Sequence, residues 1–171
     1  DEAINKAKQN FPDIDFICLD AAADLHQSLQ YKKFDLVVSS EVIEHIVLQQ
    51  DYLNNMTSLL AANGKLILTT PNAKWKSHHF YKDRVHWAQP YELWLSESDL
   101  LKLTEGKLNN RNISTFDANW IFDYSSFGIP QLFGNRLLRK MLALFNRKQE
   151  YLRYLEKKGY GLYLLMEGYQ V

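Results

Sequence analysis

The 171-residue sequence predicts an α/β fold with a doubly wound, mostly parallel sheet. Apolar runs of strand length alternate with segments of helical period, and the connections between them are short. The run at 34–40 has three successive aliphatic residues without alternation, which is typical of a strand buried on both faces. Polar or small residues follow these runs, and parallel α/β sheets bind ligands beyond the carboxyl ends of their strands. The sequence therefore predicts a ligand site next to residues 39–41.

The first 72 residues supply most of this pattern. The expected elements are, in order, a helix over 1–10, a strand over 14–19, a helix over 23–33, a strand over 34–40, a helix over 49–62 and a strand over 65–70. Pro12 ends the first helix because proline cannot continue the hydrogen-bond ladder. Gly64 is expected to end the 49–62 helix in a left-handed cap. Cys18 lies inside an apolar run and is interpreted as a small core residue.

After residue 72 the regular alternation stops. The segment 73–95 has no clean period and is interpreted as a lid or insertion. Ser96 and Asp99 resemble a capping box, which predicts that a helix begins there. The later elements are expected to be a helix over 96–105, a strand over 112–122, one or two helices over 130–158 and a last strand over 159–167. An antiparallel direction is left open for that last strand.

Charge and hydropathy narrow the classes of partner. Lys and Arg total 20, as do Asp and Glu, so no overall field attracts nucleic acid, and none is expected as a partner. No apolar run is long enough to cross a bilayer, and the polar start is unlike a signal peptide, so a cytoplasmic location is predicted. The basic segment 136–158 is interpreted as a packed helix with a solvated face. A membrane-surface role for it is the less favoured alternative.

Two stretches resemble a known family. "FDLVVSSEVIEHI" (34–46), followed by a helix and by "LLAANGKLILTTPN" (59–72), is similar to the strand-four and strand-five blocks of class I S-adenosylmethionine-dependent methyltransferases. Asn63 stands where that family has a glycine. The resemblance implies a Rossmann-like fold, S-adenosyl-L-methionine as cofactor, and methyl transfer to a small-molecule or lipid- or sugar-linked acceptor. It is fairly specific over 14–72 and weak beyond residue 95.

The resemblance also suggests how the chain is organised. It implies one methyltransferase-like domain over 1–171, with a cofactor-side core at 1–72, a lid or insertion at 73–95 and substrate-side strands and helices at 96–171. The family's glycine-rich loop after strand one would lie before Asp1, and "GYG" at 159–161 is in the wrong place for it. The fold is therefore expected to be N-terminally incomplete, with a fragment of a longer domain as the favoured interpretation. The alternative is a non-catalytic, methyltransferase-like binding or scaffold protein.

Residues at the predicted strand ends are the candidates for binding the cofactor. The resemblance implies that Asp20 accepts the adenine amino group and that the Ala21 N–H reaches the ring. It places Ser39, Ser40 and Glu41 around the methionine part. The structural alternatives are a helix cap at Asp20 and turn or N-cap roles for the serines.

Two histidines are the predicted catalytic residues, His45 and His86, because histidine can act as a base at neutral pH. His45 resembles a family histidine near the cofactor pocket, and a bond to a loop carbonyl is an equal alternative. Glu44 is adjacent to His45, so on a helix the two should point in different directions and form no simple dyad.

An aromatic lid is expected to cover a flat or amphipathic acceptor. Its predicted members are Trp75, His79, Tyr81 and Trp87. The histidine spacing in this segment does not match a compact zinc pattern, so no metal is expected. A homodimer is left open.

Overall fold

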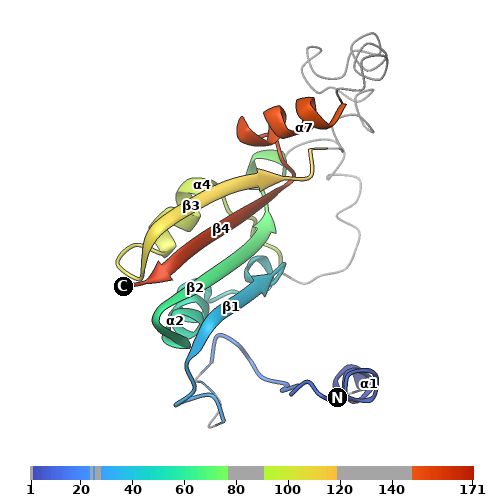
Figure 1. Cartoon of the computed structure of the whole chain (residues 1–171), viewed down its shortest axis with the longest axis vertical. Coiled ribbons are helices and arrows are strands. Elements are labelled where there is room, and N and C mark those ends of the chain that lie inside the picture. Colours follow the sequence, from blue (N-terminus) through green and yellow to red (C-terminus); the bar gives the residue numbers. More distant parts are fainter. Residues whose placement is uncertain (1, 24, 26–27, 77–90, 119–147) are drawn as a thin grey trace.

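The computed structural model describes residues 2–23, 25, 28–76, 91–118 and 148–171. Within these residues, four strands form one sheet in the order β1-β2-β4-β3 (Figure 1). They are β1 (Phe34–Ser40), β2 (Leu60–Pro71), β3 (Leu108–Phe116) and β4 (Tyr163–Gln170). The predicted α/β class is confirmed.

The described helices come from both halves of the chain. They are α1 (Glu2–Asn10), α2 (Gln49–Ser58), α4 (Glu97–Leu103) and α7 (Lys148–Lys157), with 3-10 turns η1 (Ile43–His45) and η2 (Ala73–Trp75). The helices α2 and α4 lie on one face of the sheet, α7 lies beside the end of β3, and α1 lies apart from the sheet (Figure 1).

The strand directions place several chain segments at one edge of the sheet. The pair β1 and β2 is parallel, whereas β4 is antiparallel to both β2 and β3. The last strand is thus antiparallel, and the described sheet is mixed rather than mostly parallel. Tyr163 at the start of β4 pairs with Pro71 and Phe116, the last residues of β2 and β3. We call this the carboxyl edge, and it includes Ser40 at the end of β1.

The main core lies between the sheet and the helices α2 and α4. Its buried members are Ile43, Tyr52, Leu53, Leu60, Leu66, Leu68, Leu95, Leu100, Leu108, Leu164 and Met166. The helix α4 begins with the predicted capping box, since the Asp99 N–H donates to Ser96 Oγ at 3.2 Å and the Ser96 N–H donates to Asp99 Oδ2 at 2.9 Å.

A second core cluster forms around Trp75, which the sequence assigned to the lid. Its other buried members are Ala118, Leu152, Leu155 and Leu162. Trp75 is 7% exposed, and its indole N–H donates to the Gly161 carbonyl at 3.1 Å. A Cβ on Gly161 would lie 2.4 Å from the Phe116 nitrogen, so glycine permits this close approach to β3. Trp75 therefore packs inside the protein, and its assignment to a lid over the acceptor is corrected.

The predicted strand over 14–19 does not form, and Cys18 is exposed instead of buried in the core. Leu36 and Val38, expected to be buried on both faces, are 51% and 59% exposed. Leu36 and Val38 lie on the face of β1 opposite Ser39, whose hydroxyl meets Tyr52 on α2, and the described helices α2 and α4 pack on the Ser39 face. In the described sheet β1 is also an edge strand, so its backbone has no strand hydrogen-bonded on its other side.

Some predicted boundaries also shift. The helix expected over 49–62 ends at Ser58, and β2 begins at Leu60. Asn63 takes the positive φ, 61°, where Gly64 was expected to, and both lie within β2. Turns occupy 28–31 in place of the helix expected over 23–33, of which residues 24, 26 and 27 lie outside the description. The parts of the predicted elements at 119–122 and 130–147 also lie outside it.

Candidate functional site

The two serines that end β1 make different contacts. Ser39 is buried, and its hydroxyl lies 2.7 Å from the Tyr52 hydroxyl on α2. Ser40 is exposed, and its hydroxyl lies 3.1 Å from Thr69 Oγ1 on β2. Successive strand residues point to opposite faces, so Ser39 fixes α2 against the sheet while Ser40 stays accessible at the carboxyl edge.

Glu41 follows β1 in an unusual backbone conformation. Its φ is 54°, a region that residues other than glycine seldom adopt, and its N–H donates to the Thr69 carbonyl at 3.1 Å. Its Oε1 atom is enclosed and has no hydrogen-bond partner among the described residues. The pKa of the Glu41 carboxyl is raised, chiefly by burial and further by the nearby Glu44 charge. A hydrogen bond with the Thr69 side chain and the charge of His45 lower the pKa in part.

Glu44 lies deeper, in the 3-10 turn η1, and is 1% exposed. Its Oε2 accepts a hydrogen bond from Thr70 Oγ1 at 3.0 Å, and its Oε1 lies 3.6 Å from His45 Nε2. The expectation that the Glu44 and His45 side chains point in different directions is therefore wrong, although 3.6 Å is too long for a hydrogen bond between them. That prediction assumed the side-chain directions of an α-helix, whereas these residues occupy one short 3-10 turn.

His45 has a polar neighbour at each ring nitrogen. Its Nδ1 lies 3.3 Å from the Tyr91 carbonyl, a contact in which Nδ1 carries the proton and donates. Its side chain is 33% exposed, with Nε2 towards Glu44. The structure therefore contains the loop-carbonyl bond that was the structural alternative for this residue.

Tyr163 belongs to the same edge, and sequence reasoning missed it. Its ring stacks on Phe116 with centroids 5.3 Å apart. Burial raises the pKa of the Tyr163 hydroxyl, and the negative charges of Glu41, Asp117 and Glu44 raise it further. The missed signal is that an antiparallel last strand begins, rather than ends, at the carboxyl edge. Sequence reasoning likewise gave no role to Thr70, which donates a hydrogen bond to Glu44.

The predicted adenine segment lies on an irregular stretch before β1. Asp20 Oδ1 accepts a hydrogen bond from the Ala22 N–H at 2.9 Å, which is the local cap-like role. The Ala21 carbonyl accepts from Asn55 Nδ2 on α2 at 3.0 Å. This anchors the segment to α2. The predicted residues His79, Tyr81, His86 and Trp87 lie outside the described residues.

The described residues contain no group of three or more His, Cys, Asp or Glu side chains that could hold a metal ion. None of the helices described is long and apolar enough to cross a membrane.

The structure is that of an α/β protein with polar side chains beyond the ends of its parallel strands, which is where sheets of this class bind ligands. A family model for a methyltransferase domain matches residues 1–159. The chain therefore belongs to the methyltransferase-domain family.

Solved structures share this fold at low sequence identity. A SAM-dependent methyltransferase from Archaeoglobus fulgidus aligns with a TM-score of 0.60 and 16% identity, over 98% of this chain and 73% of that one. The N-methyltransferase NodS from Bradyrhizobium japonicum, in complex with S-adenosyl-L-homocysteine, aligns with a TM-score of 0.50 and 15% identity. That alignment covers 98% of this chain and 61% of NodS.

A curated relative shares a shorter segment. A highly reducing polyketide synthase of Penicillium soppii is 34% identical over 73 residues, which are 41% of this chain and 3% of the synthase. The chain thus spans a small part of that relative and about three fifths of NodS, at 61%.

Proposed function

We propose that this chain acts in S-adenosyl-L-methionine-dependent methyl transfer to a small-molecule or lipid- or sugar-linked acceptor. The observation that carries the proposal is the enclosed Glu41 Oε1, which has no partner among the described residues and lies at the end of β1. A buried polar atom without a partner is costly, and a ligand donor would satisfy it. The family membership supplies the reaction class.

The residues at this edge fit a cationic ligand. The methionine part of the cofactor carries a positively charged amino group and a sulfonium, and Glu41 offers a carboxylate oxygen within a partly buried site. When bound, the cofactor supplies a methyl group on sulfur that is already activated for displacement. The protein then has to hold the two reactants in line and handle a proton.

The chain's own residues divide these tasks. Glu41 would hold the cationic end, and Ser40 would line the space beside it. The contact of His45 Nδ1 with the Tyr91 carbonyl favours a structural role for that residue. His86 remains the residue proposed for proton transfer, and Asp20 and Ala21 remain those proposed for the adenine.

The experiment compares Asp20→Ala, Asp20→Asn and His86→Ala in the full-length protein. Loss of one charge-assisted hydrogen bond costs about 1.5–3 kcal/mol, so both Asp20 variants should bind S-adenosyl-L-homocysteine roughly tenfold or more weakly by calorimetry. Asp20→Asn keeps an oxygen that can accept the Ala22 N–H. This variant therefore separates the effect of losing the charge from the effect of losing that local hydrogen bond. Asp15→Ala, an exposed aspartate on the same segment, is the matched control.

The same variants test the catalytic assignment. His86→Ala should retain cofactor affinity and lose turnover in a methyl-transfer assay. Unchanged affinity in both Asp20 variants would remove the adenine assignment, and full activity in His86→Ala would remove the base. If the full-length protein binds no S-adenosyl-L-homocysteine at millimolar concentration, the binding or scaffold alternative replaces the enzyme. The exposed apolar side chains of the edge strand β1 favour that alternative because they present an open surface for a partner.

A further inference from the structure

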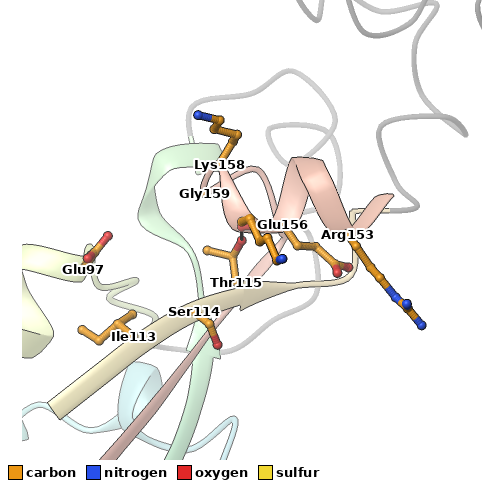
Figure 2. Close-up of a pocket in the computed structure, with 9 residues that line it drawn as sticks. Glu97, Ile113, Ser114, Thr115, Arg153, Glu156, Lys158 and Gly159 are labelled. Atoms are coloured by element: carbon orange, nitrogen blue, oxygen red, sulfur yellow. Dashed lines mark hydrogen bonds between the residues drawn. The ribbon is translucent and has the colours of Figure 1, made fainter. Parts of the chain in front are cut away.

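A groove of about 670 Å³ runs between β3, α7 and the start of α4 (Figure 2). A second hollow of about 530 Å³ continues it past Asn72 and Lys74. The two share four lining residues, namely Glu97, Thr115, Lys158 and Gly159, so they form one continuous groove. It lies outside the edge formed by Glu41, Glu44 and Tyr163, none of which lines it.

Positive side chains outnumber negative ones along the groove. The cations are Lys74, Arg153, Lys157 and Lys158, against the carboxylates of Glu97 and Glu156. The Glu156 Oε1 accepts a hydrogen bond from the Ala118 N–H at 3.2 Å, and the carboxylate still counts as one of the two negative charges. Within the described part of the chain, Arg153 and Lys157 make no ion pair. The groove therefore has positive charge that the described residues leave unneutralised.

Hydrogen bonds of Thr115 join the elements at the floor of the groove. Thr115 Oγ1 donates to the Glu156 carbonyl at 2.6 Å and accepts from the Gly161 N–H at 3.0 Å, which ties α7 and the segment before β4 to β3. Gly159 ends α7 with a φ of 77°, and a Cβ there would meet nothing within 4 Å. The helix α7, which carries Arg153 and Lys157, is thus tied to β3 beside open space at Gly159.

Figure 2 shows how these cations are spread. Arg153 and Lys158 extend in different directions from α7, on either side of Glu156. A single carboxylate could approach one of them. A larger anion with several charged oxygens could approach more than one, and Arg is well suited to phosphate because its planar group donates two parallel hydrogen bonds.

We propose that this groove binds a diphosphate group, held by Arg153 and Lys157 with Lys158 and Lys74 along its length. The same group occurs in a nucleoside diphosphate and in a lipid diphosphate, and both fit the chemistry of the groove. The proposal does not rest on methyl transfer, since Glu41, Glu44 and Tyr163 do not line the groove.

The test titrates the full chain with inorganic pyrophosphate by calorimetry, in parallel with inorganic phosphate and citrate. Pyrophosphate should bind with a Kd below about 1 mM and more tightly than either of the other anions. The double variant Arg153→Gln/Lys157→Gln should weaken binding about tenfold or more, because two charged donors are lost. Both side chains are exposed, so the fold should be retained, which circular dichroism checks.

Two further variants make the test specific. Lys6→Gln/Lys8→Gln removes two charges from α1, away from the groove, and should leave the affinity unchanged. Glu97→Gln removes a negative charge from the groove and should tighten binding. Two results would overturn the proposal. One is that the Arg153/Lys157 variant binds pyrophosphate as tightly as the Lys6/Lys8 variant does. The other is that the native chain shows no binding of pyrophosphate at 5 mM, which is about the useful limit of the method. Uridine diphosphate, compared with vesicles that contain a lipid diphosphate, then identifies which source is bound.

Discussion

Thr70 on β2 donates a hydrogen bond from its hydroxyl to the buried carboxylate of Glu44, with 3.0 Å between Oγ1 and Oε2. Both residues are almost fully buried, at 0% and 1% exposed. The bond joins the turn after β1 to the end of the neighbouring parallel strand. It therefore fixes the position of the acidic residues that lie next to the proposed cofactor site.

Thr70→Val should destabilise the protein by about 1.5–3 kcal/mol, because a buried carboxylate loses a donor. Thr104→Val is the matched control, since Thr104 is also 0% exposed but donates to a neutral acceptor, the Leu100 carbonyl, at 2.7 Å. That control should cost only about 0.5–1.5 kcal/mol. Urea unfolding measures both free energies, and equal losses would show that the Glu44 carboxylate does not strengthen the Thr70 bond.

The buried Ser39 and Tyr52 hydroxyls, 2.7 Å apart, should be energetically coupled. We expect a double-mutant cycle of Ser39→Ala and Tyr52→Phe to give a coupling energy of about 0.5–1.5 kcal/mol from chemical unfolding. Each single variant leaves the other buried hydroxyl without its partner. Each should therefore lower the free energy of unfolding by more than half of the amount that the double variant does. Additive single effects would mean that the pair contributes nothing beyond its separate packing.

Glu41→Gln should change how stability depends on pH. The folded-state pKa of Glu41 is raised above its ordinary value of 4.5, chiefly by burial, so the folded state favours the protonated form. The stability that the protonated Glu41 contributes is fully present below pH 4.5, and it is lost as the pH rises through the raised folded-state pKa. Relative to the native protein, Glu41→Gln should therefore become more stable as the pH rises above 4.5.

Unfolding free energies between pH 4 and 8, about the range in which this effect develops, measure the difference. Glu105→Gln, at an exposed position, is the comparison and should show no such trend. A flat difference between Glu41→Gln and the native protein across this range would contradict the burial of that carboxyl.

The exposed apolar side chains of β1 should make the isolated 171-residue chain associate with itself. Leu36→Lys introduces a charge on the edge strand and should lower the fraction of associated chain in sedimentation velocity. Tyr154→Lys is the control, because Tyr154 on α7 is also 51% exposed but does not lie on a strand. If the control reduces association as much, general surface hydrophobicity rather than the open strand is responsible.

The predictions that the structure confirms rest on local patterns. Alternation of apolar runs and helical stripes was enough to place β1 at 34–40, α1 and the α/β class. The capping box at Ser96 and Asp99 was readable because its partners are three residues apart. The ligand site predicted from the polar ends of two parallel strands stays a prediction; Glu41, whose Oε1 has no partner among the described residues, follows one of those strands.

Only the tertiary structure decided which of these residues meet. The Thr70–Glu44 bond, the Glu44–His45 contact and the arrival of Tyr163 at the carboxyl edge depend on strand order and on the antiparallel direction of β4. The sequence determined that 14–19 is apolar, but an apolar run becomes a strand only where a neighbouring strand accepts its hydrogen bonds. Without that neighbour in the described sheet, Cys18 is exposed and one side of β1 stays open. Periodicity depends on nearest neighbours along the chain, whereas burial depends on contacts between segments far apart in it.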